Sequence, residues 1–223
     1  MSQNPIYTAI SEIIAMRKPD DQPLVVGING VDGSGKTQFT KNLSSSLDQA
    51  VCIHIDDFHN PKHHRYNRGE QSPEGYYHDS INYDYFANEA LRPIKHAKVY
   101  PVRVKSKLLD LVTDQEDHQF INVFGNSIVL VEGVFLFRPE IAQFLDLKIF
   151  IECSFDITLE RMKQRDVEDQ NDLQAVNDYA LRTQQKYTPG QKLYFEDVSP
   201  QSIADIVIDN NDFNSPQIIH MCA

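Results

Sequence analysis

Hydrophobic residues in this chain gather in short, unbroken runs rich in valine and isoleucine, instead of alternating with polar residues. Unbroken runs of this kind are typical of strands that are buried on both faces of a sheet. The pattern predicts five strands, at residues 24–28, 51–55, 127–133, 147–152 and 204–209.

Segments with helical spacing separate these runs. Apolar residues recur on one face of a predicted helix over residues 5–17. Further helices are predicted at residues 36–48, 83–92, 154–165 and 172–186. Strands that alternate with helices indicate an α/β fold, with a five-stranded, mostly parallel sheet and helices on both faces.

The stretch between the second and third predicted strands has a different composition, rich in His, Tyr, Asn, Pro and Gly near its start. Residues 98–124 within it suggest a β-hairpin. We interpret residues 59–124 as a small insertion that builds a substrate-binding wall. The whole chain, residues 1–223, is then one domain.

Composition narrows the class of protein. The formal net charge of −11 argues against a nucleic-acid or anionic-membrane surface, because such partners need a basic face. The three cysteines are scattered and form no CxxC pair, which fits a reducing compartment. No apolar run approaches about 18 residues, and the first residues lack the pattern of a signal peptide. We therefore expect a cytoplasmic protein, and homo-oligomerisation stays open.

The stretch "GVDGSGKT" follows the first predicted strand and precedes a predicted helix. It fits GxxxxGK[ST], the P-loop pattern, in which glycines let backbone N–H groups point at phosphates. In that pattern Lys36 neutralises the terminal phosphates and the Thr37 hydroxyl binds Mg²⁺. The residues expected to hold ATP are Gly30, Asp32, Gly33, Ser34, Gly35, Lys36, Thr37 and Gln38.

Acidic residues stand at the ends of two further predicted strands. Ligands of open α/β sheets bind at the carboxyl ends of the strands, so these residues are candidates for chemistry. Glu132 in "VLVEG" is expected near Mg²⁺ together with Thr37. Asp56 or Asp57 in "HIDDFHN" could take a proton from an attacking hydroxyl. Helix caps or solvated turns are the alternative for each.

Together, "GVDGSGKT", "DDF", "VEGVF" and "DITLERMKQRD" resemble the uridine kinase and phosphoribulokinase family of P-loop kinases. Nicotinamide riboside kinase and bacterial pantothenate kinase are related folds. The resemblance implies an enzyme that transfers a phosphoryl group from Mg·ATP to an alcohol. It also implies that the Asp of a D-x-[FY] element is the catalytic base, which maps to Asp56. Asp57 is the alternative if the register shifts by one residue.

The resemblance also implies a mobile lid over residues 154–190. Arg161 and Arg165 lie four apart on one predicted helix face, where they would close over the phosphates and stabilise transferred charge. An exposed helix with solvated charges is the alternative. Residues 186–200 contain Pro and Gly, and we interpret them as a connector to the last strand. Closure of the acceptor site by a lysine of this segment is the other interpretation.

The predicted acceptor pocket lies in "RYNRGEQSPEGYYHDSINYDYF". Aromatic rings there could cover a base or sugar, histidine and aspartate could bond ribose hydroxyls, and arginine could hold an anionic group. Core packing is the equal alternative for the tyrosines. A metal shared by His59 and His63 is a further alternative. The candidate acceptor residues are His59, Arg68, Tyr76, Tyr77, His78 and Asp79.

These patterns predict a kinase that uses ATP and Mg²⁺ to phosphorylate a small hydroxyl compound, with a uridine- or cytidine-like nucleoside as first candidate. Two elements of the uridine kinase pattern are absent, because "YYHDSINYD" lacks its proline and "VYPVRV" lacks its Tyr–Asp pair. Pantothenate, nicotinamide riboside or a sugar phosphate is therefore the alternative, and Arg68 with Lys62 and Arg65 would suit an anionic acceptor. A regulatory NTPase is a further alternative, although the chain has no NKxD guanine reader.

Overall fold

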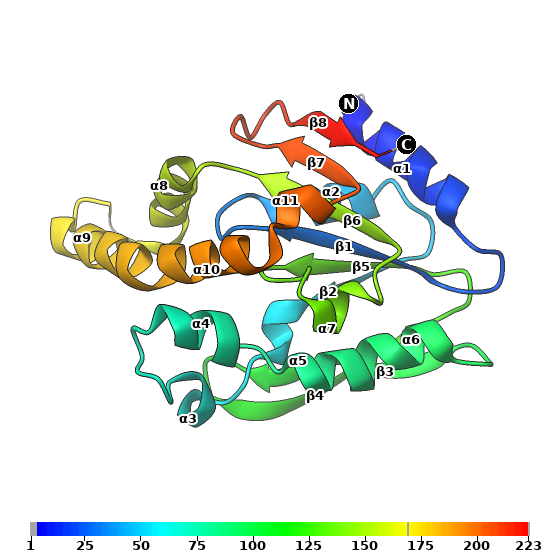
Figure 1. Ribbon diagram of the computed structural model, residues 1–223, viewed down its shortest axis with the longest axis horizontal. Coiled ribbons are helices and arrows are strands. Elements are labelled where there is room, and N and C mark those ends of the chain that lie inside the picture. The colour runs from blue at the N-terminus through cyan, green and yellow to red at the C-terminus, as the bar shows by residue number, and fades with distance from the viewer. Residues whose placement is uncertain (1–3, 169, 223) are drawn as a thin grey trace.

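A six-stranded sheet forms the centre of the protein (Figure 1). The computed structural model describes residues 4–168 and 170–222. Five strands are parallel and the last pairs antiparallel at one edge. In spatial order the strands are β2 (Ala50–His54), β5 (Ile128–Gly133), β1 (Leu24–Gly30), β6 (Leu147–Glu152), β7 (Ile206–Asp209) and β8 (Gln217–Met221).

The α/β fold and the five strands predicted from the apolar runs are confirmed, with small shifts of their ends. The predicted strand number is wrong, because β8 adds a sixth strand. Four of the five residues of β8 are exposed, so this edge strand has no buried apolar run that a sequence pattern could reveal.

Helices cover both faces of the sheet, and some of them project beyond it on the left of the picture (Figure 1). The helical elements, including one 3₁₀ turn (η1) and two π-helical stretches (η2, η3), are α1 (Pro5–Arg17), α2 (Lys36–Ser44), η1 (Ile55–Phe58), α3 (Lys62–Arg65), α4 (Pro73–Asp79), α5 (Tyr83–Tyr85), η2 (Phe86–Leu91), α6 (Arg92–His96), α7 (Pro139–Ala142), α8 (Phe155–Asp166), α9 (Leu173–Arg182), η3 (Thr183–Tyr187), α10 (Thr188–Val198) and α11 (Pro200–Ile203). Within the described residues, none of these helices is long and apolar enough to cross a membrane.

Two hydrophobic cores lie on the two faces of the sheet. Along β1, Leu24, Val26 and Ile28 pack with helices α1 and α2, whereas Val25 faces the second core. That second core contains side chains of η1, α4, α6 and α10 together with the hairpin. Both faces of β1 are buried, which explains its unbroken apolar sequence.

The predicted hairpin is present as strands β3 (Val102–Asp110) and β4 (Gln115–Val123), which pair with each other apart from the main sheet. Figure 1 shows this hairpin beside the helices α5 and α6, below the central sheet. Val104 and Val123 join the second core, so the hairpin packs against the domain.

The connector predicted at residues 186–200 is wrong, because helix α10 occupies Thr188–Val198 and follows η3 directly. Pro189 follows the π-helical stretch η3, and such a local change of helix geometry is compatible with a residue that has no N–H to donate. Gly190 lies against α4, since a Cβ there would come within 2.7 Å of the Tyr76 ring and 2.9 Å of the Pro73 carbonyl oxygen. The Pro-Gly pair therefore marks a helix contact and not a break.

Gly133 ends β5 directly after Glu132 and has a φ of +151°, a conformation that favours glycine. An added Cβ would overlap the side chain of Ile55, the residue before Asp56. We expect Gly133→Ala to lower the free energy of unfolding by about 3 kcal/mol, through strain and overpacking. Urea denaturation measures this loss.

Gly69→Ala is the matched control, because Gly69 has a φ of +100° but, its chain neighbours aside, no described residue has an atom within 4 Å of an added Cβ. Backbone strain alone should cost about 1 kcal/mol there. Equal losses in the two variants would contradict the close packing of Gly133 on Ile55.

Candidate active site

The loop Gly30–Thr37 joins β1 to α2 and wraps around its own lysine. Gly33 and Gly35 have φ values of +74° and +94°, and a Cβ on Gly33 would come within 2.8 Å of the Thr158 carbonyl oxygen. Lys36 is buried and donates a hydrogen bond from Nζ to the Val31 carbonyl oxygen, 2.9 Å away. The loop thus has the curled backbone that a phosphate cradle requires.

A cavity of about 640 Å³ opens beside this loop. Its walls come from the loop, η1, the end of β5, α8 and the segment after β7. Gly30 and Ser34, also predicted to hold ATP, are not among its lining residues. The predicted site residues that line it are Asp32, Gly33, Gly35, Lys36, Thr37, Gln38, Asp56, Glu132, Arg161 and Arg165.

Glu132 is buried at the end of β5 and meets Thr37 across the cavity. The Thr37 hydroxyl donates to Oε1 of Glu132 at 3.1 Å, and Nδ1 of His54 lies 2.6 Å from the same oxygen. Burial raises the pKa of Glu132, but the His54 hydrogen bond and the charge of Lys36 outweigh it, so the pKa lies below its usual value.

The second oxygen of Glu132, Oε2, is buried and has no hydrogen-bond partner among the described residues. A carboxylate oxygen left unpaired next to a threonine hydroxyl fits the oxygen ligands that Mg²⁺ prefers. The donor set therefore suits the expected ion.

His54 has no role in the sequence-based hypothesis. The strand register reveals its position, because β2 pairs with β5 so that His54 stands opposite Glu132. Sequence alone does not give this register. We infer from the contact that His54 orients the Glu132 carboxylate.

Asp56, at the start of η1, lines the cavity, whereas Asp57 does not. The charged groups that act on Asp57 are His54 and His59 together with Lys107 and Asp117 of the hairpin. The Asp56 side chain is exposed at the surface of the cavity, but the protein atoms packed around its carboxyl still raise its pKa, although His59 and Lys36 act against the rise. A carboxylate with a raised pKa, facing the cavity, suits a proton acceptor.

His59 lies just beyond η1, with Nδ1 2.5 Å from the carbonyl oxygen of Asp56. Desolvation lowers the pKa of His59. A neutral ring that donates through Nδ1 leaves Nε2 as an acceptor for a substrate hydroxyl.

The two predicted lid arginines come from α8 and have different partners. Arg161 donates from one Nη to the carbonyl oxygens of Asn210 and Asn211, at 2.9 and 3.0 Å, and lies over the Phe213 ring. Arg165 is exposed and bonds the carboxylate of Asp166 at 2.5 and 2.8 Å. Both line the cavity, so both are within the site that the sequence assigned to them.

Phe213 also lines the cavity and has no role in the sequence-based hypothesis. Its ring is half exposed, at 48%. Asn210 anchors the same segment, because its Nδ2 donates to the Ser34 carbonyl oxygen at 2.6 Å. An exposed ring in this position is suited to stack on a nucleotide base.

Tyr77 is a core residue, which corrects its assignment to the acceptor pocket. It is 1% exposed, and its hydroxyl donates to Asp197 at 2.6 Å. Tyr83 and Phe86 are buried in the same core. Tyr76 instead reaches the loop, where its hydroxyl donates to Oδ2 of Asp32 at 2.6 Å.

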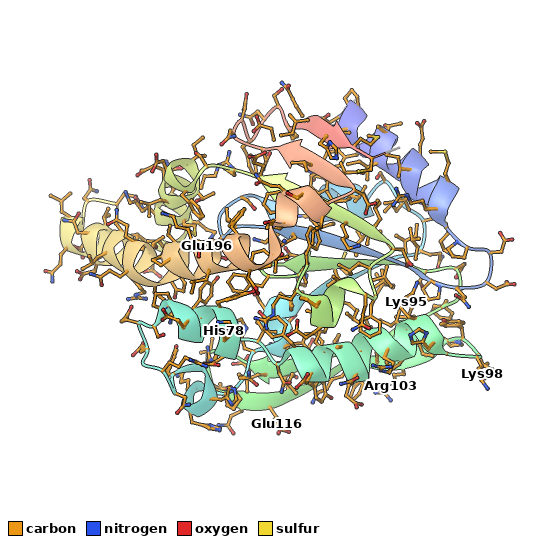
Figure 2. All side chains as sticks on the ribbon, in the orientation of Figure 1. His78, Lys95, Lys98, Arg103, Glu116 and Glu196 are labelled. Carbon is orange, nitrogen blue, oxygen red and sulfur yellow. The ribbon has the colours of Figure 1, made fainter. Side chains whose placement is uncertain are left out.

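The other predicted acceptor residues on and near α4 do not line the cavity. Arg68 and Asp79 bond each other at 2.7 Å. His78 is exposed on α4, as Figure 2 shows. Within the described part of the chain, no group of three His, Cys, Asp or Glu side chains could hold a metal, which leaves the His59–His63 alternative without a third ligand.

Comparison with known proteins agrees with this geometry. A family model described as Phosphoribulokinase / Uridine kinase family matches residues 25–210. The chain belongs to this family. It is therefore a phosphotransferase that acts on a hydroxyl group of a small molecule, and the family implies the use of ATP.

Curated relatives and solved structures extend the comparison. A uridine kinase of Clostridium botulinum (strain Okra / Type B1) is 25% identical over 211 residues, 91% of this chain and 95% of that protein. A uridine kinase of Saccharomyces cerevisiae is 30% identical over 156 residues, which cover 67% of this chain but only 30% of the yeast protein.

Two solved structures share the family fold. The structure of a possible uridine kinase from Bacillus stearothermophilus has a TM-score of 0.70 at 22% identity and covers 90% of this chain and 96% of its own. D-glycerate 3-kinase from Cryptococcus neoformans has a TM-score of 0.61 at 12% identity, with 96% and 99% covered. At these identities the likeness concerns the fold alone.

Proposed function

We propose that the chain transfers the γ-phosphoryl group of Mg·ATP to a hydroxyl group of a nucleoside, with uridine and cytidine as first candidates. The observation that carries the transfer is the Asp56 carboxyl, which faces the same cavity as Lys36, Thr37 and Glu132. The nucleoside is supported by the uridine kinases among the curated relatives.

The predicted catalytic and metal-binding residues of the cavity each have a role in this proposal. Lys36 and the backbone amides of the loop bind the phosphates, and Thr37 with Glu132 holds Mg²⁺, which supplies positive charge when bound. Asp56 accepts the proton of the attacking hydroxyl. Arg161 and Arg165 stabilise the negative charge of the transferred group.

A second candidate is a kinase for another small acceptor, such as pantothenate, nicotinamide riboside or a sugar phosphate. The observation that favours it is where the residues predicted to form the nucleoside pocket lie in the structure. Tyr77, whose ring was expected to cover a base or sugar, is in the core, and Asp79, expected to bond ribose hydroxyls, is bonded to Arg68. A regulatory NTPase is the remaining alternative.

A panel of acceptors with coupled detection of ADP tests the proposal. We expect ADP release that depends on one acceptor class and yields a phosphorylated product. ADP release without any phosphorylated acceptor would contradict a small-molecule kinase and favour a regulatory NTPase. Preference for a non-nucleoside acceptor would contradict the nucleoside and favour the second candidate.

The raised pKa of Asp56 gives a pH prediction. Because the base must be ionised, kcat/KM for the acceptor should fall as the pH falls through this raised pKa. The acidic limb of the profile should therefore lie above the usual aspartate range, about pH 4. Rates at saturating Mg·ATP across the acidic range measure it, and an acidic limb in the usual aspartate range would contradict a desolvated base.

A further inference from the structure

Two cations meet at the ring of Tyr66, on the insertion side of the protein. Nζ of Lys186 lies 5.0 Å from the ring centroid, and Cζ of Arg65 lies 5.3 Å from the same centroid. Lys186 comes from η3 and Arg65 ends α3, so two elements far apart in the sequence build the cluster. The chain as a whole has a formal net charge of −11, so these two cations form a local region of opposite sign.

Neither cation has its full set of partners. Lys186 is only 8% exposed; the charge of Glu70 acts on it, but among residues 4–168 and 170–222 no carboxylate oxygen is close enough for an ion pair. Arg65 bonds Asp114 through one Nη at 3.1 Å, but its Nε is buried and has no hydrogen-bond partner in the described part of the chain. Packing against protein costs an ammonium part of its hydration, and contact with an aromatic ring returns only part of that cost.

The electrostatics agree with this geometry. Burial lowers the pKa of Lys186; the negative charge of Glu70 opposes the change, and the positive charges of Arg65 and Arg182 add to it. An anion bound by both Lys186 and Arg65 would reduce the repulsion between them and give the Nε of Arg65 an acceptor.

The cluster does not line the cavity, but two chains of interactions connect it to residues that do. Arg65 is close enough to His59 to contribute to the lowering of its pKa, and His59 bonds the Asp56 carbonyl oxygen. On the other side the ring of Tyr187, next to Lys186, lies 5.0 Å from the ring of Tyr76, whose hydroxyl bonds Asp32 of the P-loop. Residues 67–70 beside the cluster are exposed, which leaves it an approach from solvent.

We propose that Lys186 and Arg65 bind an anionic group, a phosphate or a carboxylate, of the molecule whose hydroxyl group is phosphorylated. This inference rests on the proposed kinase function and, within it, favours the second candidate over a neutral nucleoside. The ammonium and the free guanidinium edge supply directed donors for such an anion, and they offset the repulsion that Asp32 and Asp56 exert on it.

Equilibrium binding to the wild-type protein, with a non-hydrolysable ATP analogue and Mg²⁺ in the donor site, tests the inference. The probes are D-ribose 5-phosphate for phosphate, D-glycerate and pantothenate for carboxylate, and D-ribose and uridine as neutral compounds. We expect at least one anionic probe to bind about 10-fold or more tighter than both neutral ones. The better anion identifies the phosphate or the carboxylate as the recognised group.

Lys186→Met keeps the length of the side chain and removes its charge. It should weaken binding of the anionic probe by about 10- to 100-fold and leave binding of the ATP analogue unchanged. Lys186→Arg should retain most of the affinity. Lys98→Met is the charge-matched control, because Lys98 is exposed in the loop after α6, at the opposite end of the molecule from α9 (Figure 2).

Tighter binding of uridine than of every anionic probe would overturn the inference, as would unchanged anion binding in Lys186→Met. If that variant does not fold, Lys186→Gln and the wild-type comparison of anionic with neutral probes decide in its place. Rapid phosphorylation of uridine would contradict only the anion site and would leave the proposed kinase function standing. If ATP stays intact with every acceptor, the proposed function itself is contradicted.

Discussion

Asp56→Asn is expected to lower kcat for phosphoryl transfer by about 10²- to 10⁴-fold, the range that a general base contributes. The carboxyl faces the cavity that Lys36 and Thr37 share, and its raised pKa matches the task of accepting a proton. Asparagine keeps the shape of the side chain and removes the basic oxygen. Initial rates with the acceptor identified from the panel measure the loss, and calorimetry with ADP checks that nucleotide binding is retained.

Asp57→Asn is the matched control for this variant. Asp57 is adjacent in the same 3₁₀ turn but does not line the cavity, so its replacement should leave kcat within a few-fold of the wild type. Normal turnover in Asp56→Asn, or a larger loss in Asp57→Asn, would show that the wrong aspartate has been assigned as the base.

Lys36→Met should lower kcat/KM for ATP by about 10²- to 10³-fold, the loss typical for removal of one group that stabilises developing charge. The Nζ of Lys36 is held by the Val31 carbonyl oxygen and points into the loop that is expected to hold phosphates. Methionine keeps the buried chain and removes the ammonium. Rates measured as a function of ATP concentration, together with binding of ADP, separate weaker binding from slower transfer.

Lys41→Met provides the comparison for this second variant. Lys41 stands on the same helix α2, exposed and away from the cavity, so the net charge changes equally while the phosphate loop is untouched. Its kcat/KM for ATP should stay near that of the wild type. Similar losses in Lys36→Met and Lys41→Met would mean that overall charge, and not the loop, controls ATP use.

The fold could be predicted from the sequence wherever local pattern and burial coincide. Strands β1 and β5 are buried on both faces, so their apolar runs were unambiguous. Strand β8 could not be found, because it is an exposed edge strand held by its pairing with β7. Helix α10 was read as a connector because Pro189 and Gly190 are usual helix breakers. Only the contact of Gly190 with α4 explains their presence.

The ATP-binding half of the candidate site could be predicted for the same reason. The P-loop is one contiguous segment, and Glu132 lies at the end of an adjacent strand. The acceptor half depends on tertiary placement. Whether a tyrosine such as Tyr77 faces a pocket or the core is decided by its partner Asp197, far away in sequence. The pairing of His54 with Glu132 depends in the same way on the register of β2 and β5.

Phosphorus NMR of the complete reaction tests the central claim most directly. The wild-type protein is incubated with Mg·ATP and the acceptor panel, and the fate of the γ-phosphoryl group is followed. A small-molecule kinase gives one phosphorylated acceptor for each ADP formed, with little inorganic phosphate, and Asp56→Asn stops both signals. Formation of ADP and inorganic phosphate in equal amounts, with every acceptor unchanged, would contradict the account.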